Sequence, residues 1–452
     1  MTTRQRVLVV FCLALFPIVW VGADFLLAQY QALGKVIPSG ATLRWYKGNT
    51  HTHTLWSDGN DFPESVVRYY KVNGYNFLAL TDHNVLSRGE RWMPVSEVVA
   101  RRKTLGHPTM EKYRALFGAD WVETRESEKD GAEEVRLKAL EEFRGTFEKK
   151  GEFLLIEGEE VTDGYKDGDR KREVHINAIN LGEEIAPQGG GSVEEVISNN
   201  LRLIREQEQR LHRPILVHLN HPNFQWSIKP TDIASVIDQR FFEVYNGHPF
   251  INHLGREAAN GVEAVPGDEQ IWDIVNTIRI RDLKVPPLLG VATDDAHHYH
   301  GGESSPGRGW VMVHAQKLAA PDLIGAMRDG QFYASSGVTL SLVHDDSESL
   351  RVDIVKQEGA TYVTEFFGTR KDSDPSQTGE LLASDEDTMV IYHFSGDELF
   401  VRARVTSSLD HPNPSFEGQK QQAWTQPVGW KAQLPAPQSE LENVAVDGGV
   451  TK

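Results

Sequence analysis

Histidines and carboxylates of this chain recur where strand-like segments end, and these residue types are common metal ligands. The first group is the run Gly48-Asn49-Thr50-His51-Thr52-His53-Thr54, which is followed by Asp58. Side chains at alternate positions of an extended chain point the same way, so His51 and His53 can share one metal ion. Imidazole nitrogen and carboxylate oxygen suit zinc, manganese or iron, and the sequence does not distinguish these metals.

Further histidines and acids follow the later strand-like segments. In chain order they are Asp82 and His83; Glu157, Glu159 and Glu160; His175; His218 and His221; His248; and Asp294, Asp295 and His297. The carboxyl ends of strands form the active-site face of parallel α/β folds. Charged and imidazole groups are seldom buried without partners, so this recurrence is hard to explain as core filling. The pattern predicts one ordered metal site.

The segments that must position these residues alternate between strand-like and helix-like patterns. The strand-like runs are 45–49, 77–80, 153–157, 175–181, 214–219, 241–245, 288–292 and 310–314. The helical candidates are 62–73, 193–209, 231–237, 271–282 and 321–328. This alternation predicts an α/β protein with a parallel sheet, either open or closed into a barrel.

Two stretches depart from the alternation. Residues 96–150 are highly charged and carry apolar residues spaced for one helix face, which predicts a helical insertion. That insertion is either a lid or a solvated excursion without a role. Short strand-like runs separated by Asp, Ser and Gly predict a small C-terminal all-β domain at 338–434. The remaining tail, 435–452, is rich in Pro, Gly and acids and is predicted to be flexible.

The N-terminus has the pattern of an export signal. Arg4 and Arg6 precede an apolar run at 7–23 that ends in small residues. This predicts a signal peptide at 1–23, or an uncleaved N-terminal anchor, because residues 25–28 prolong the apolar stretch. Either form predicts a periplasmic or extracellular body that contacts the membrane only through this segment. The single cysteine, Cys12, lies in the run, so the body has neither disulfides nor a cysteine-based metal site.

The charge balance argues against one class of partner. The formal net charge is −18, from 47 basic and 65 acidic side chains. We therefore expect no nucleic-acid binding through a basic surface. An acidic body can still bind an anion where metal ions reverse the local field. The expected partner is a small-molecule ester substrate.

The ordered motifs resemble those of the PHP family, which is named for polymerase and histidinol phosphatase. They are the His51/His53 run with Ser57-Asp58-Gly59; Thr81-Asp82-His83; Gly158-Glu159-Glu160-Val161; His175; His221-Pro222; and Asp295-Ala296-His297. The resemblance spans about residues 45–300. The later segments 309–313 and 332–337, and the all-β tail, are similar to the carbaryl-hydrolase-like branch.

The resemblance implies a distorted (β/α)7 TIM-like barrel over 42–337 that holds two or three divalent metal ions. His51, His53 and Asp295 would hold the first ion. Glu160 would bridge to a second ion held by His175 and His221. Asp58, His83 and His297 would hold a third. The Gly-x-Glu spacing favours Glu160 over Glu157 and Glu159, and His221, which precedes Pro222, fits better than His218.

Other polar residues near these motifs have two possible roles each. Asp82 and Asp294 neighbour predicted ligands, so each either orients a ligating histidine or caps the turn that follows it. His248 either lines the substrate cleft or is an ordinary loop histidine.

The predicted activity is hydrolysis by an exported, metal-dependent enzyme. Clustered divalent ions lower the pKa of water and yield hydroxide near neutral pH, and His297 or His248 is the candidate proton donor to the leaving group. The resembled family implies a phosphoester substrate, with Arg88, Arg91, Lys166 and Arg308 as candidate phosphate clamps. The carbaryl-hydrolase-like branch implies a carboxylic ester, amide or carbamate instead. A third hypothesis is a non-catalytic, metal-containing envelope binding protein.

Overall fold

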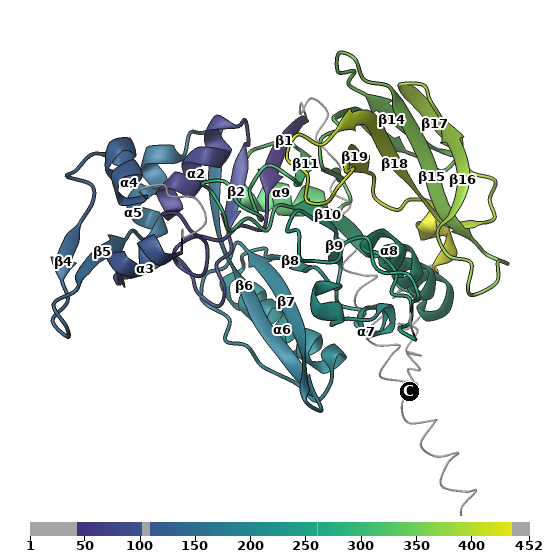
Figure 1. Cartoon of the computed structure of the whole chain (residues 1–452). Helices are drawn as coiled ribbons and strands as arrows, with labels where there is room; N and C mark the ends of the chain where they lie inside the picture. Colours follow the sequence, from purple (N-terminus) through teal and green to yellow (C-terminus); the bar gives the residue numbers. More distant parts are fainter. Residues whose placement is uncertain (1–42, 102–108, 260, 436–452) are drawn as a thin grey trace, which may run out of the picture.

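The computed structural model describes residues 43–101, 109–259 and 261–435 (Figure 1). The predicted signal peptide or anchor, and the predicted tail beyond Pro435, lie outside these residues. No helix within the described ranges is long and apolar enough to cross a membrane.

Six parallel strands form the part of the main sheet that carries the site. They are β1 (Arg44–Asn49), β2 (Phe77–Leu80), β6 (Leu154–Asp167), β8 (Leu216–Leu219), β9 (Phe241–Asn246) and β10 (Leu289–Thr293). Strand β7 (Arg170–Ile179) runs antiparallel between β6 and β8. The predicted α/β class is therefore confirmed, but β6 and β7 form a long hairpin that interrupts the expected parallel order.

The hydrogen-bonded strands of the main sheet do not close into a ring, so the predicted (β/α)7 barrel is not confirmed. Its strand order is β10-β9-β8-β7-β6-β2-β1-β11-β12-β19-β18-β15-β16. Strand β10 contacts β11 (Trp310–Ala315) and β12 (Phe332–Ser335), yet the described residues form no ladder there. A single parallel bridge, Thr52 to Ala296, joins the segments that follow β1 and β10. The segments that follow the first and the last parallel strand thus pair beside the predicted ligands His51, His53 and Asp295.

Helices cover the parallel strands. They are α2 (Pro63–Val72), α6 (Val193–Leu211), α7 (Pro230–Ala234), α8 (Asp268–Thr277) and α9 (Ala320–Arg328), with short helices η1 (Phe224–Trp226) and η2 (Ile278–Leu283). Helix α6 begins where the Ser192 side chain accepts a hydrogen bond from the Glu195 backbone, and it ends at His212, whose φ is +49°. Its buried face packs on β6 and β7 in the largest apolar core.

The segment predicted as a helical insertion forms a body of its own at one end of the molecule (Figure 1). It contains α3 (Val95–Ala100), α4 (Thr109–Phe117) and α5 (Leu140–Phe147). It also contains an antiparallel sheet of β3 (Arg91–Pro94), β5 (Glu133–Leu137) and β4 (Thr124–Glu126), which the sequence did not suggest. The insertion packs on the start of α2, where the Tyr113 ring stacks on Phe62 at 3.7 Å between centroids.

A buried acid joins the insertion to α2. The Glu64 Oε1 atom accepts hydrogen bonds from the Tyr113 hydroxyl at 2.6 Å and from Trp121 Nε1 at 2.8 Å. Burial raises the pKa of Glu64 from 4.5 to about 7, because these neutral donors do not offset the loss of water around a carboxylate. Ionised Glu64 therefore costs folding free energy above neutral pH.

We expect Glu64→Gln to stabilise the protein in alkaline solution. Glutamine keeps the Oε1 acceptor and removes the charge. Because the folded-state pKa lies above the unfolded one, the cost grows as pH rises through 4.5 and is complete above 7. The pKa difference corresponds to about 3 kcal/mol. Urea unfolding should show a gain of up to this size at pH 9 and little at pH 4.5. Exposed Glu111 on α4 supplies the control, Glu111→Gln; equal stabilities of the two variants at pH 9 would refute the buried-charge argument.

The C-terminal strands are β13 (Leu340–Asp345), β14 (Ser349–Ile354), β15 (Tyr362–Arg370), β16 (Glu380–Asp385), β17 (Met389–His393), β18 (Glu398–Asp410) and β19 (Lys420–Trp424). Of these seven strands, β15, β16, β18 and β19 continue the main sheet, and β13, β14 and β17 form a separate antiparallel sheet. Strand β19 pairs with β12, so the predicted all-β part is joined to the core by backbone hydrogen bonds. A buried ion pair from Arg402 to Asp273 on α8, 2.6 Å long, adds a second connection.

Candidate metal centre

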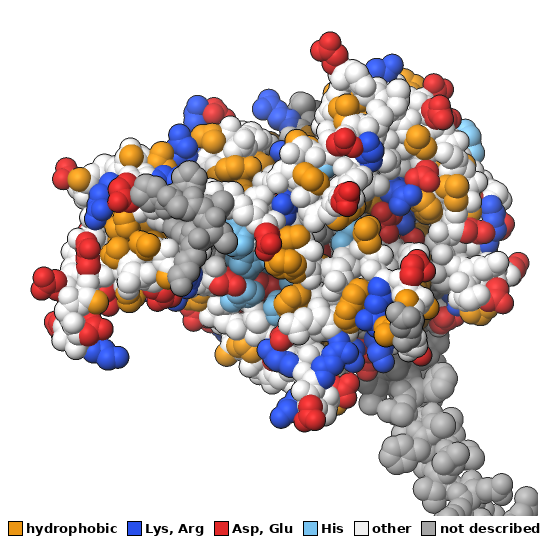
Figure 2. Space-filling view, in the orientation of Figure 1, with side chains coloured by type: hydrophobic (Ala, Val, Ile, Leu, Met, Phe, Trp, Pro, Cys, Tyr) orange, Lys and Arg blue, Asp and Glu red, His pale blue; other side chains and the backbone are white. Residues whose placement is uncertain are grey.

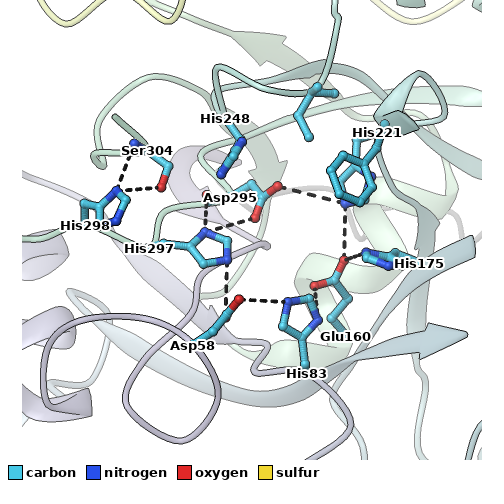
Figure 3. A pocket seen from close by; sticks show the side chains of 12 residues that line it. Asp58, His83, Glu160, His175, His221, His248, Asp295, His297, His298 and Ser304 are labelled. Carbon is cyan, nitrogen blue, oxygen red and sulfur yellow. Dashed lines mark hydrogen bonds and ion pairs between the residues drawn. The ribbon is translucent and has the colours of Figure 1, made fainter. Parts of the chain in front are cut away.

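All nine predicted metal ligands lie in one cluster, and Figure 3 shows those that line its cavity. They form four overlapping groups, in each of which the ligand atoms lie within 4.8 Å of one another. The groups are His51, His53 and Asp295; His51, Glu160 and His221; His83, Glu160 and His175; and His53, Asp58, His83 and His297. Six segments, four that follow strands and the two strands of the β6–β7 hairpin, thus deliver donor atoms to one place.

The most buried group lies where β1 ends. His53 Nε2 is 3.1 Å from Asp295 Oδ1, and His51 Nε2 is 3.3 Å from Glu160 Oε2. Both histidines and Glu160 are fully buried. Among the described residues, His51 Nε2 and Glu160 Oε2 have no hydrogen-bond partner. Buried lone pairs without donors are costly in a metal-free protein, whereas a cation between them would satisfy both. The group therefore fits a metal ion.

Glu160 connects this group to the next one. Its Oε1 atom lies 3.0 Å from His175 Nδ1 and 3.4 Å from His221 Nε2, and it accepts a hydrogen bond from Asn220. Burial disfavours charge on Glu160, but the imidazoles of His83, His51 and His175 hold the pKa of its carboxyl well below its usual value. Glu160 therefore presents two ionised oxygens to two sets of imidazoles, as a bridging ligand would.

The group that contains Asp58 is open to solvent. Asp58 Oδ1 lies 3.3 Å from His297 Nε2, and Asp58 Oδ2 lies 3.6 Å from His83 Nε2. The Asp58 side chain is 57% exposed, whereas the carboxylates of the other groups are buried. Burial, with the nearby imidazoles of His297 and His83, lowers the pKa of His53 to about 3, which keeps this ring neutral. A neutral imidazole is the form that binds metal.

Two of the predicted ligands have left-handed backbone conformations. The φ angle is +22° at His221 and +47° at Asp295, a region that side-chain-bearing residues rarely adopt. Hydrogen bonds hold both positions: the Asp295 amide donates to the His51 carbonyl, and the His221 amide donates to Glu243 Oε2. Such strain persists only where the surroundings impose it, and it is concentrated at functional sites.

Glu243 in β9 is a site residue that the sequence analysis missed. Its Oε1 atom lies 2.7 Å from His51 Nδ1 and 2.7 Å from the Thr293 hydroxyl, and its Oε2 atom accepts from the His221 amide and from Asn246. Burial opposes its charge, but His51 lowers the pKa of Glu243 to about 2. An ionised Glu243 accepts a hydrogen bond from His51 Nδ1–H and so fixes the tautomer in which Nε2 faces Glu160 and Asp295 as a potential metal ligand. The sequence did hold one signal for Glu243: it is an acid inside an otherwise mostly apolar strand, Phe241–Asn246.

Asp82 and Asp294 hold loops and do not bond directly to predicted ligands. Asp82 accepts hydrogen bonds from the backbone and hydroxyl of Thr54 and from Ser57 Oγ, which itself lies 3.4 Å from His53 Nδ1. Asp82 thus reaches His53 only through Ser57. The Asp294 carboxylate accepts from the Tyr70 hydroxyl and from three consecutive amides at residues 307–309.

The structure distinguishes among the alternatives for the bridging acid and the second histidine. Glu157 pairs with Arg88, and Glu159 accepts a hydrogen bond from the Ile185 amide, so of the three glutamates only Glu160 joins the cluster. His218 is buried with Nε2 3.4 Å from the Thr50 carbonyl and belongs to none of the four groups.

A cavity of about 320 Å³ opens beside the cluster. Its lining adds Phe224, His248, Ile251, His298 and Ser304 to the predicted ligands, and Figure 2 shows histidine side chains in a hollow near the middle of this face. Burial lowers the pKa of His248 to about 4, so its ring is neutral at pH 7. Its Nδ1 atom accepts from the Phe250 amide, which leaves an Nε2–H donor. His297 donates from Nδ1 to the Asp295 carbonyl. Its Nε2 atom, beside Asp58, is then placed to bind a metal ion and not to donate a proton to the substrate.

The four candidate phosphate clamps do not line this cavity, whose described lining has neither lysine nor arginine. Arg88 pairs with Glu157, and Arg91 donates to the Trp56 carbonyl. Arg308 donates to the Gly247 and Asn413 carbonyls. Lys166 lies exposed near the tip of the β6–β7 hairpin. Proximity in sequence to the motifs was not enough to place these cations at the site.

Solved structures similar to this chain include proteins described as metal-dependent phosphoesterases. One, from Bacteroides vulgatus ATCC 8482, is a two-domain protein containing a predicted PHP-like metal-dependent phosphoesterase; it is 15% identical, with a TM-score of 0.36, over 85% of this chain and 96% of that one. Another, provisionally described as a metal-dependent phosphoesterase from Bifidobacterium adolescentis ATCC 15703, is 14% identical, with a TM-score of 0.26, over 57% of this chain and 89% of that one. The chain matches no protein-family model and no curated protein.

Proposed function

We propose that this chain is a PHP-type, metal-dependent phosphoesterase. The observation that carries the proposal is the convergence of unsatisfied, buried lone pairs, His51 Nε2 and Glu160 Oε2, inside a cluster of nine potential ligands. A structural metal site is usually closed by its ligands, whereas this cluster borders a cavity and includes a half-exposed Asp58. The open side favours catalysis over a purely structural or binding role.

The residues present fit two or three divalent ions, in the arrangement that the family resemblance implies. His51, His53 and Asp295 would hold one ion, Glu160 would bridge to a second held with His175 and His221, and Asp58, His83 and His297 would hold a third. When bound, such ions supply an acidified water as nucleophile and polarise the oxygen of the electrophile.

The remaining residues of the cavity bind and orient the substrate. His248 is neutral and presents an Nε2–H group, so it donates a hydrogen bond to a substrate oxygen at neutral pH. His298 has the same form, because its Nδ1 atom accepts from the backbone and hydroxyl of Ser304. Phe224 and Ile251 add apolar surface to the lining of the cavity. His297 is assigned as a ligand, and His248 as the candidate catalytic residue.

Hydrolysis of a carboxylic ester, amide or carbamate is the second candidate function. The observation that favours it is the absence of lysine and arginine from the described lining of the cavity. In such a cavity only the metal ions could neutralise a phosphoryl dianion, whereas an uncharged ester needs no neutralisation. The phosphoester remains the first proposal because clustered divalent ions can supply that positive charge themselves.

The test is a substrate panel assayed on metal-reconstituted protein. Phenyl phosphate and bis(4-nitrophenyl) phosphate would be compared with phenyl acetate and an aryl methylcarbamate, each with added Zn²⁺, Mn²⁺ or Fe²⁺. Metal-stimulated turnover of a phosphoester is the expected result. Turnover confined to the acetate or carbamate would transfer the proposal to the second class.

Export is part of the same proposal. The basic residues and apolar run at the N-terminus support it. Fractionation of cells that produce the full chain would place the protein outside the cytoplasm, with a mature N-terminus near residue 24 if the signal is cleaved.

A further inference from the structure

The insertion contacts the loop that presents Asp58. This loop, residues 54–62, links β1 to α2, and residues from several elements of the insertion bond to it. Arg91 at the start of β3 donates to the Trp56 carbonyl, and the Trp56 indole donates to the Lys138 carbonyl at 3.1 Å. Lys112 on α4 pairs with Asp61 at 2.7 Å. The insertion is therefore neither a detached lid nor a solvated excursion, because it supports one wall of the site.

Arg101 makes the contacts nearest to Asp58. Its Nη1 atom donates to the carbonyls of Ser57 and Gly59, the residues on either side of Asp58, and the second of these bonds is 3.1 Å long. Its Nη2 atom donates to Glu97 Oε1 at 3.0 Å, which fixes the guanidinium plane. One guanidinium thus binds both carbonyls, and the Asp58 side chain between them contacts His83 and His297.

On its other side the same loop fits closely against the cluster. A Cβ atom at Gly59 would lie 2.6 Å from the His53 carbonyl carbon, and the Asn60 amide donates to the His297 carbonyl at 2.9 Å. The carboxylate of Asp58, which is 57% exposed, contacts Ser57 Oγ at 3.4 Å and the imidazoles of its own group at 3.3 to 3.7 Å, so the loop backbone sets where these contacts can form. A shift of this backbone changes the distances from Asp58 to His83 and His297 directly.

We propose that Arg101 is a positioning residue through which the insertion sets the metal affinity of the Asp58, His83 and His297 group. This inference rests on the proposed metal centre and adds a role for a segment outside it. Arg101 touches neither the cavity nor a predicted ligand side chain, so it acts only through the loop backbone. The other two predicted ion sites, one of His51, His53 and Asp295 and one of Glu160, His175 and His221, are built on other segments and do not depend on it.

The test compares Arg101→Met with Arg114→Met in the full chain. Arg114 lies on α4 of the same insertion, is 42% exposed, and has the Glu133 carboxylate at 3.9 Å. Metal content would be measured after dialysis against graded free Mn²⁺. We expect Arg101→Met to weaken the loosest-bound ion about tenfold or more and to leave the tighter ions unchanged. Arg114→Met should match the unmodified chain, and Arg101→Lys should recover part of the lost affinity.

Hydrogen exchange of the metal-free proteins supplies a second readout that does not depend on activity. The amides at 57–60 should exchange faster in Arg101→Met, while those of β1 and β6 keep their protection. Unchanged Mn²⁺ binding in both Arg101 variants would overturn the inference while leaving the proposed function intact. An unmodified chain that binds no divalent ion would overturn the inference together with the proposed function. If Arg101→Met fails to fold, Arg101→Lys is compared with Arg114→Met: weaker Mn²⁺ binding in Arg101→Lys alone supports the inference, and equal binding in both overturns it.

Discussion

Glu160→Gln is expected to lower metal-stimulated hydrolysis by about three orders of magnitude or more. Glu160 is the one residue whose two oxygens face two groups of imidazoles, 3.3 Å from His51 on one side and 3.0 Å from His175 on the other. Glutamine has almost the same shape, but its amide carries no charge and replaces one acceptor with a donor. The loss should therefore affect the binding of two ions at once.

The neighbouring Glu159 provides a matched control for this prediction. It is also buried, but it bonds to the Ile185 amide on the other face of β6, and burial raises its pKa to about 8. Glu159→Gln should retain activity and metal content. Metal content would be read by mass spectrometry of the dialysed proteins, and turnover by phosphate release. Equal activities of the two variants would exclude Glu160 as the bridging ligand.

Glu243→Gln is expected to reduce metal affinity or activity by about 10- to 100-fold, the usual effect of removing the carboxylate behind a ligating histidine. Glu243 accepts four hydrogen bonds, including those from His51 Nδ1 and the His221 amide. The amide group of glutamine would point its N–H bonds at groups that themselves donate hydrogen bonds. Either the His51 ring or the left-handed backbone at His221 would then have to move.

Two further variants separate orientation from general damage at Glu243. Thr293→Val removes one of the four hydrogen bonds, so its effect should be smaller and in the same direction. Glu208→Gln changes a partly exposed acid that pairs with Arg328 outside the cavity lining and should have no effect. Zinc affinity would be measured by competition with a chromophoric chelator. Wild-type affinity in Glu243→Gln, in a folded protein, would refute the orienting role.

Local sequence patterns predicted the strands that carry the site and the residues that gather there. The alternation of short apolar runs with amphipathic segments placed β1, β2, β8, β9 and β10 within a few residues of their observed bounds. Strand-end positions then brought seven of the nine residues to one side, because parallel strands share the edge at which they end, whereas Glu160 and His175 lie within the β6–β7 hairpin. The ligand roles of these residues remain a prediction that the variants above address.

The remaining features depend on contacts between distant segments. His175 was expected at the start of a parallel strand, whereas it lies within the antiparallel β7, opposite Thr162 of β6. Which way a hairpin folds back is not encoded in a run of apolar residues. Glu243 was overlooked because an isolated acid in a strand acquires meaning only once its register against His51 is known. A charge within a fully buried strand needs a partner, and this rule would have singled it out.

The cationic residues were the least predictable part of the site. Arg88 and Arg308 follow motif strands in the sequence, yet each is bound by carboxylates or carbonyls outside the cavity. A long, flexible side chain reaches many partners from one backbone position, so its target depends on the tertiary structure. Arg101, which holds the Asp58 loop, has no motif around it at all.

Anomalous diffraction from crystals grown with Mn²⁺ tests the central claim most directly. Two or three anomalous peaks are expected inside the cluster, one of them between His51, His53 and Asp295 and in contact with Glu160. The peak beside Asp58 should be the weakest, since that group is the most exposed to solvent. The absence of peaks among these nine residues, or peaks only elsewhere on the acidic surface, would contradict the assignment of a catalytic metal centre.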